Sequence, residues 1–206
     1  MKNDFNLNES FKQSTFTHTV SFEVNEHTAM ILADPCYKEG IMELIREGEQ
    51  SSFAVEGAAF GGYFPRMKKG TYRVEIQTIP GSKNTASWVC KHQDTSTYDM
   101  EIGLEVMVDS GQVGLFFAHT AYQAEAIPED EIQLKSMEYE GNDLHPWYTY
   151  MCATSLNYFY QNAMGICTDS GYGDGCYFAY AFINEEDEVV AIEITFDEPD
   201  NEWDWD

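Results

Sequence analysis

Three short stretches combine side chains that can do chemistry with residues that form tight turns. They are Asp34-Pro35-Cys36-Tyr37, the run from Val108 to Gly114, and Gly171-Tyr172-Gly173-Asp174-Gly175. Each borders a strand-like run, and strand ends are where a rigid scaffold presents functional loops. We therefore expect these loops to lie close together. The candidate ligand-binding residues are Asp34, Cys36, Tyr37, Asp109, Gly173, Asp174 and Gly175.

Cys36 is a candidate nucleophile. A catalytic thiol needs a lowered pKa, which a nearby base or a helix N-terminus provides, and a helix is predicted to begin at Glu39. Asp34 acts in the opposite direction, because a neighbouring anion raises the pKa of a thiol. No His–Asn partner pattern accompanies Cys36 in the sequence. We interpret Cys36 as a structural cysteine and predict no catalytic residue.

The glycines at 171, 173 and 175 allow two interpretations. They permit a tight turn and the close approach of a ligand. The stretch lacks the Gly-Lys-Ser/Thr of a phosphate-binding P-loop, and it leads into a strand rather than a helix, unlike a dinucleotide-binding loop. It is either a weak ligand-binding loop, which Asp174 would make unfavourable for phosphate, or a turn that feeds the next strand.

The C-terminal part is strongly acidic. From Asn184 onward there are eleven acidic residues and no Lys or Arg, with Trp203 and Trp205 among the last acids. Carboxylates can take the positions of phosphates on a basic surface, and indole rings can stack on arginine. The alternative is a solvated tail whose tryptophans cap the sheet. The candidate partner-binding residues are Glu185, Glu186, Asp187, Glu188, Asp197, Glu198, Asp200, Glu202, Trp203, Asp204, Trp205 and Asp206.

Patterns of metal-binding residues are missing from the sequence. The five histidines are scattered, the five cysteines form no C-x-x-C pair, and the acids at 185–188 lack the spacing of an EF-hand loop. We therefore expect no metal and no cofactor. The cysteine spacing, with the absence of a signal-like N-terminus, predicts reduced thiols and a cytoplasmic location.

The net charge limits the classes of partner. The chain has 206 residues with 36 acidic and 11 basic side chains, which gives a net charge of −25. The last basic side chain other than histidine is Lys135, so all later charge is acidic. Phosphates would be repelled, which argues against direct nucleic-acid or anionic-membrane binding. A basic protein partner fits this field, and so does simple solubility.

Alternating apolar and polar residues predict a β-rich chain. Strands are predicted at 15–24, 28–34, 53–65, 70–80, 85–93, 100–109, 110–118, 163–170, 175–184 and 189–197. Helices are predicted at 39–48 and 146–162, an acidic loop at 127–145, and an acidic hairpin turn at 184–188. The pattern indicates one α+β domain of mostly antiparallel sheet, sandwich-like or barrel-like, with about nine or ten strands and two helices. We place this domain at 15–198, between a flexible N-terminus at 1–14 and an acidic tail at 199–206.

The motifs at 34–37, 109–114 and 173–175, with the final "VVAIEITF" run, resemble an uncharacterised bacterial and phage family, domain of unknown function 4241. The resemblance covers roughly Ala29 to Phe196. It implies an intracellular β-rich fold in which the first and third loops lie close together, and it implies no reaction. Cys176 stands where a serine or another small residue is commoner in that family, and the acidic tail is stronger here.

Three functional hypotheses follow from these residues. The favoured one is a non-enzymatic inhibitor of a basic, nucleic-acid-handling partner such as a nuclease or toxin, in the manner of phage anti-defence, anti-CRISPR or immunity proteins. The second is a binder of a small ligand or nucleotide signal that uses the three loops. The third, an enzyme with Cys36 or Asp174 in its site, has the least support.

Overall fold

The structure is a computed structural model that describes residues 3–4, 18–25, 28–82, 84–125, 159–162 and 165–196. The predicted acidic loop at 127–145, the first part of the predicted helix at 146–162 and the tail from 197 onward lie outside these ranges. The boundaries proposed at 15 and 198 lie outside them as well.

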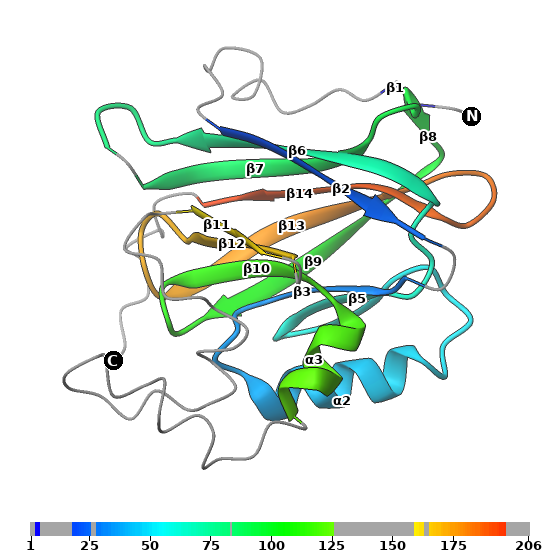
Figure 1. Cartoon of the computed structure of the whole chain (residues 1–206), viewed down its shortest axis with the longest axis horizontal. Helices are drawn as coiled ribbons and strands as arrows, with labels where there is room; N and C mark the ends of the chain where they lie inside the picture. Colours follow the sequence, from blue (N-terminus) through cyan, green and yellow to red (C-terminus); the bar gives the residue numbers. More distant parts are fainter. Residues whose placement is uncertain are drawn as a thin grey trace, which may run out of the picture.

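The first sheet, here called the helix-covered sheet, has six antiparallel strands in the order β11-β12-β10-β3-β5-β4 (Figure 1). Its strands are β3 (Met30–Ala33), β4 (Glu56–Ala58), β5 (Gly61–Phe64), β10 (Gln112–Phe117), β11 (Phe159–Asn162) and β12 (Gly165–Asp169). All four residues of β3 are buried. The sequence of β3 is apolar at every position, as expected for a strand that is covered on both sides.

The second sheet, here called the long-strand sheet, is also antiparallel, in the order β2-β6-β7-β14-β13-β9. Its strands are β2 (His18–Val24), β6 (Gly70–Thr78), β7 (Thr85–His92), β9 (Met100–Val108), β13 (Gly175–Ile183) and β14 (Val189–Thr195). The short strands β1 (Asn3–Asp4) and β8 (Thr97–Tyr98) pair separately. In β9, the residues Leu104, Val106 and Val108 are buried and alternate with exposed ones, as expected for a strand with one solvated side.

The main core lies between the two sheets. Trp88 and Tyr72 of the long-strand sheet pack in one buried cluster with Leu32, Leu115 and Ile166 of the helix-covered sheet. Burying each large apolar side chain contributes about 1.5–3 kcal/mol. The molecule is therefore a β-sandwich, which confirms the mostly antiparallel α+β prediction and excludes the closed-barrel form of it.

The two helices of the described residues pack on the helix-covered sheet (Figure 1). They are α2 (Lys38–Gly48) and α3 (Ala118–Glu125). Ile41 and Ile45 of α2 are buried against Ile31 of β3 and Phe116 of β10 in a second cluster, to which Ala121 of α3 belongs. The spacing of the apolar residues in α2 puts them on one side of the helix, which confirms the helix predicted at 39–48. No helix among the described residues is long and apolar enough to span a membrane.

Three predictions of secondary structure need correction. Phe159–Asn162, taken as the end of a helix, is strand β11 and pairs with β12. The run at 53–65, taken as one bent strand, forms the antiparallel pair β4–β5, and Gly61 has a φ of +140°. Helix α3 was not predicted, because its eight residues follow β10 without a break and show little apolar periodicity. The two sheets therefore hold twelve strands rather than nine or ten.

Candidate functional site

The first two predicted loops are joined through the carboxylate of Asp34. Asp34 is fully buried. Its Oδ2 accepts hydrogen bonds from the backbone N–H of Asp109 (2.7 Å) and of Ser110 (2.8 Å). Its Oδ1 accepts from the Ser110 hydroxyl (2.7 Å) and from the backbone N–H of Cys36 (2.8 Å). Both carboxylate oxygens of Asp34 thus accept two hydrogen bonds each. Through these bonds Asp34 joins the loop after β3 to the turn that follows β9.

The third loop lies against the second. The backbone N–H of Ser170 donates to the carbonyl of Gly111 (2.9 Å), and the Tyr177 hydroxyl donates to the carbonyl of Gly173 (2.9 Å). A Cβ added to Gly111 would lie 3.9 Å from the Cα of Gly173. Gly111 and Gly173 both have positive φ, +66° and +97°, which favours glycine at these turns. The expected closeness of the three loops is thus present in the structure.

Asp169 also shapes this end of the sandwich, and it was not among the candidates. Its carboxylate accepts from the backbone N–H of Thr85 (2.9 Å), the Thr85 hydroxyl (2.9 Å) and the backbone N–H of Gly171 (2.9 Å). These bonds tie β12 to β7 across the two sheets. The sequence contained an indication of this role. Asp169 stands two residues before Gly171, and an aspartate at this spacing often accepts a hydrogen bond from the backbone N–H of the second residue after it, which forms an Asx turn.

Cys36 and Tyr37 both face acidic surroundings. Partial burial of the thiol, followed by the charges of Asp34 and Asp109, raises the pKa of Cys36 to about 12. Burial and the charge of Asp109 likewise raise the pKa of Tyr37 to about 12. The thiol is therefore protonated at neutral pH, which is the reverse of what an activated nucleophile requires.

The other predicted loop residues lie at the surface of the same cluster. Asp174 is exposed, and Gly175 begins β13. Among the described cysteines, Cys90 and Cys167 are buried whereas Cys36 and Cys176 are exposed, and all four are free thiols. Within the described residues, no group of three or more His, Cys, Asp or Glu is arranged to hold a metal ion.

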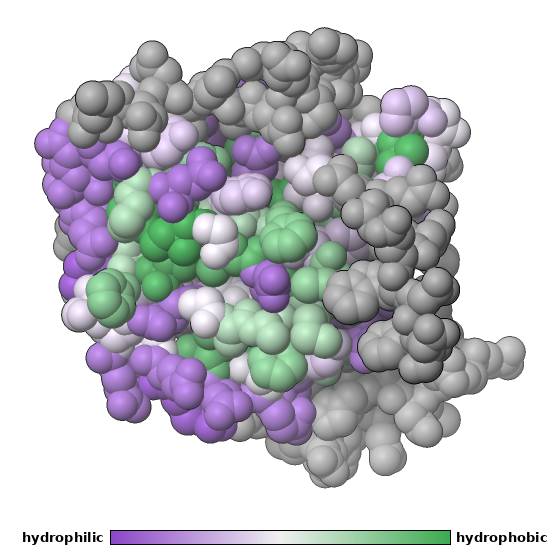
Figure 2. All heavy atoms as spheres, turned by 180° about the vertical axis from the view of Figure 1, so that it is seen from behind, coloured by the Kyte–Doolittle hydropathy of each residue, from purple (hydrophilic) through white to green (hydrophobic). Residues whose placement is uncertain are grey.

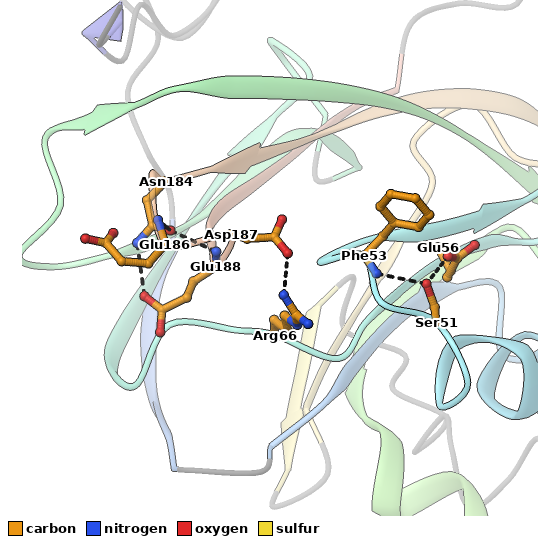
Figure 3. A network of polar contacts seen from close by, with 8 residues as sticks. All are labelled: Ser51, Phe53, Glu56, Arg66, Asn184, Glu186, Asp187 and Glu188. Carbon is orange, nitrogen blue, oxygen red and sulfur yellow. Dashed lines mark hydrogen bonds and ion pairs between the residues drawn. The ribbon is translucent and has the colours of Figure 1, made fainter.

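The acidic residues at 185–188 form the turn between β13 and β14. Asn184 organises it: its side-chain oxygen accepts from the backbone N–H of Glu186 (3.2 Å) and of Glu188 (2.8 Å), and its side-chain amide donates to Glu188 (3.0 Å) (Figure 3). Asp187 has a φ of +60° and forms an ion pair with Arg66 (2.5 Å). Asp187 and Glu188 are thus used within the protein. The other eight candidate partner-binding residues, from Asp197 to Asp206, lie outside the described part of the chain.

A surface that the sequence analysis did not identify lies on the outward side of β9, β13 and β14. We call it the outer aromatic face. Its residues are Glu101, Gly103, Glu105, Met107, Cys176, Phe178, Tyr180 and Glu193. Phe178 is 58% exposed, Met107 41% and Tyr180 40%. Figure 2 shows apolar residues gathered near the centre of this side of the molecule, with hydrophilic residues along its left and lower border.

Strand pairing fixes the neighbours on this face. Tyr180 on β13 lies directly between Glu193 on β14 and Gly103 on β9, and Phe178 lies opposite Glu105. The sequence signal was in β13 itself. Its run Cys176–Phe182 is apolar at nearly every position, whereas a strand with one solvated side alternates apolar and polar residues.

Glu193 is the unusual residue of the outer aromatic face. Its exposed fraction is 5%, although Glu193 points away from the core between the core residues Ile192 and Ile194. Burial, followed by the charge of Glu101, raises the pKa of Glu193 to about 7. A carboxyl in such a site is partly charged at neutral pH and gains from a cationic partner.

A scan of protein-family models, a search of the curated proteins and a search of the solved structures found no match to this chain. The family resemblance drawn from the loop motifs therefore stays a prediction.

Proposed function

We propose that this protein works by binding another protein, and that its partner presents a basic surface that otherwise handles nucleic acid. The observation that carries this proposal is the outer aromatic face, where Phe178, Tyr180 and Met107 are exposed beside Glu101 and Glu105 in a chain of net charge −25. The function is inhibition: the partner's basic groove is occupied by carboxylates and aromatic rings instead of phosphates and bases.

The residue types support a protein interface. Tyr, Phe and Met are enriched where proteins bind each other, and a few buried aromatic side chains usually supply most of the affinity. Exposed carboxylates beside them speed association with a basic partner and reject acidic ones. A nuclease or toxin that binds nucleic acid has such a basic groove.

The loop cluster supports the non-enzymatic side of the proposal. Its buried carboxylate, Asp34, is engaged by four hydrogen bonds within the protein. Its thiol, Cys36, has a raised pKa. Asp34 thus serves the fold, and the Cys36 thiol is not activated as a nucleophile.

Inhibition assays on nucleases and toxins with basic grooves test the proposal. The double variant Phe178→Ser, Tyr180→Ser should lose inhibition by roughly a hundredfold or more, because two aromatic anchors are removed. Tyr122→Ser is the matched control, since Tyr122 is a 39% exposed aromatic on α3, away from the outer aromatic face. Inhibition by wild type should weaken with added salt and compete with nucleic acid. An unchanged inhibition constant in the double variant would contradict the proposal.

A second candidate, binding of a small ligand or nucleotide signal, is favoured by one observation. The three loops meet at one end of the sandwich, where Gly111 and Gly173 bring two backbones together. Exposed Asp174 is the side chain there that a ligand would contact. A thermal-shift screen of nucleotides against wild type and Asp174→Ala decides it, because a real ligand should stabilise the first and not the second.

A further inference from the structure

The carboxyl group of Glu193 lacks a cationic partner within the described part of the chain. Neighbouring Ile192 and Ile194 point into the core, which turns Glu193 to the outer aromatic face. No hydrogen bond or ion pair joins its side chain to another described residue. Glu193 is 5% exposed, and a charged carboxylate on a residue of such low exposure is costly unless a cation or a hydrogen-bond donor offsets the loss of water. The carboxyl oxygens of Glu193 are not among the enclosed unpartnered atoms of the described residues, so a cation from outside the sandwich can reach them and offset this cost.

The neighbours of Glu193 determine what kind of cationic group could bind beside it. Gly103 has no side chain, and a Cβ added there would lie 3.7 Å from Cε1 of Tyr180. The Tyr180 ring thus extends over the gap at Gly103, between Glu101 and Glu105 on the same strand. A group that enters here meets one aromatic ring and carboxylates on either side of it.

Arginine matches these neighbours better than lysine does. Its guanidinium is planar and weakly hydrated, it stacks on aromatic rings, and its N–H donors pair with a carboxylate through two parallel bonds. A lysine ammonium is a compact, strongly hydrated charge that loses more on entering a site of low exposure.

We propose that the outer aromatic face contains a subsite for one arginine side chain of the partner, with Glu193 pairing with the guanidinium and Tyr180 stacking on it. This subsite rests on the proposed function, because it assigns the basic contact that the partner makes. Glu101 and Glu105 add to the attraction from the β9 side, and Phe178 covers the hydrocarbon part of the arginine side chain.

The subsite should depend on pH, because protonated Glu193 cannot pair with a cation. The charged and titratable groups around Glu193 are Tyr180 on β13, Glu101 on β9, Tyr98 on β8, Lys91 on β7, and Arg73 and Glu75 on β6. Arg73 is paired with Glu75, and Glu75 is the carboxylate that acts on Lys91. Glu193 is the member of this group whose pKa is raised to about 7, so arginine binding should strengthen as the pH rises through about 7.

Fluorescence-labelled hexa-arginine and hexalysine peptides of equal charge test the subsite with the full chain at low ionic strength. Wild type should prefer hexa-arginine by roughly fivefold to tenfold at pH about 8, and Glu193→Gln should lose that preference. Glu43→Gln is the control, since it removes the same charge from an exposed position on α2. Tyr180→Leu, which keeps Glu193, should also reduce the preference for arginine.

The outcomes separate the subsite from the proposed function. If wild type binds both peptides equally, or if Glu193→Gln and Glu43→Gln behave alike, the subsite is wrong while a basic partner is still supported. If neither peptide binds wild type, both proposals are contradicted. A preference for arginine that stays the same at pH about 6 and about 8 would remove Glu193 from the site.

Discussion

Two buried carboxylates of this protein have opposite environments. Asp34 accepts hydrogen bonds from three backbone N–H groups and one hydroxyl. Glu193 has none from the described residues and lies beside the like charge of Glu101. A carboxylate that accepts several hydrogen bonds within the protein usually serves the fold, whereas a carboxylate of low exposure without such bonds and with a raised pKa is a candidate for a functional site. The contrast assigns Asp34 to the fold and supports the proposal that Glu193 takes part in binding.

Asp34→Ala should lower the free energy of unfolding by roughly 3–5 kcal/mol, because it leaves several buried N–H groups without an acceptor. Asp174→Ala is the matched control, and as an exposed loop residue it should change stability by about 0.5 kcal/mol or less. Urea denaturation of the three proteins measures both effects. Equal stability of the two variants would show that the hydrogen bonds of Asp34 between the loops contribute little.

Glu193→Gln should change how stability depends on pH. The folded-state pKa of about 7 lies above the ordinary value of 4.5, so between these values the folded protein holds a proton that the unfolded chain has lost. The stabilisation that Glu193 contributes is complete below about pH 4.5 and is lost as the pH rises through about 7.

The difference in unfolding free energy between wild type and Glu193→Gln should therefore shift by about 2 kcal/mol from pH about 5.5 to about 8, with wild type losing stability relative to the variant. Urea denaturation at several pH values measures this shift. Parallel stability profiles for the two proteins would mean that Glu193 titrates as an ordinary exposed carboxyl.

At the scale of elements, the predictable strands were those with clean alternation. The strand predicted at 70–80 corresponds to β6 (Gly70–Thr78), and the strand predicted at 100–109 corresponds to β9 (Met100–Val108). In both strands the buried residues alternate with less buried ones over most of the length. Phe159–Asn162 was misassigned since a run of aromatic and amide residues fits the apolar side of a helix as well as an edge strand. Only the pairing with β12 decides between the two.

Of the candidate sites, the loop cluster could be predicted from the sequence and the outer aromatic face could not. The three loops were expected to meet because turn residues follow strand ends, and the bonds of Asp34 and the contact between Gly111 and Gly173 bring them together. The outer aromatic face could not be located from the sequence, because it depends on which strands become neighbours. Glu193 and Tyr180 are 13 residues apart in the chain, and only the register of β13 with β14 places them side by side.

For the whole molecule, the question is which acidic residues contribute to binding. The net charge of −25 attracts any basic partner from a distance, but screening limits this attraction to about 10 Å at about 0.1 M salt. Two sets of acids are accompanied by aromatic side chains that can anchor a partner. One lies on the outer aromatic face, and the other is the acidic tail with Trp203 and Trp205.

A chain that ends at Pro199 separates these two sets, because it removes the last four acids and both tryptophans and leaves β14 intact. If the outer aromatic face carries the interface, this truncated chain should keep most of its inhibition, with slower association, since lost charge mainly affects the on-rate. The double variant Phe178→Ser, Tyr180→Ser should dissociate faster instead, because aromatic anchors set the off-rate. Association and dissociation rates measured at two salt concentrations distinguish the two effects. A truncated chain that dissociates as fast as the double variant would assign the anchors to Trp203 and Trp205, and the outer aromatic face would then be a supporting surface.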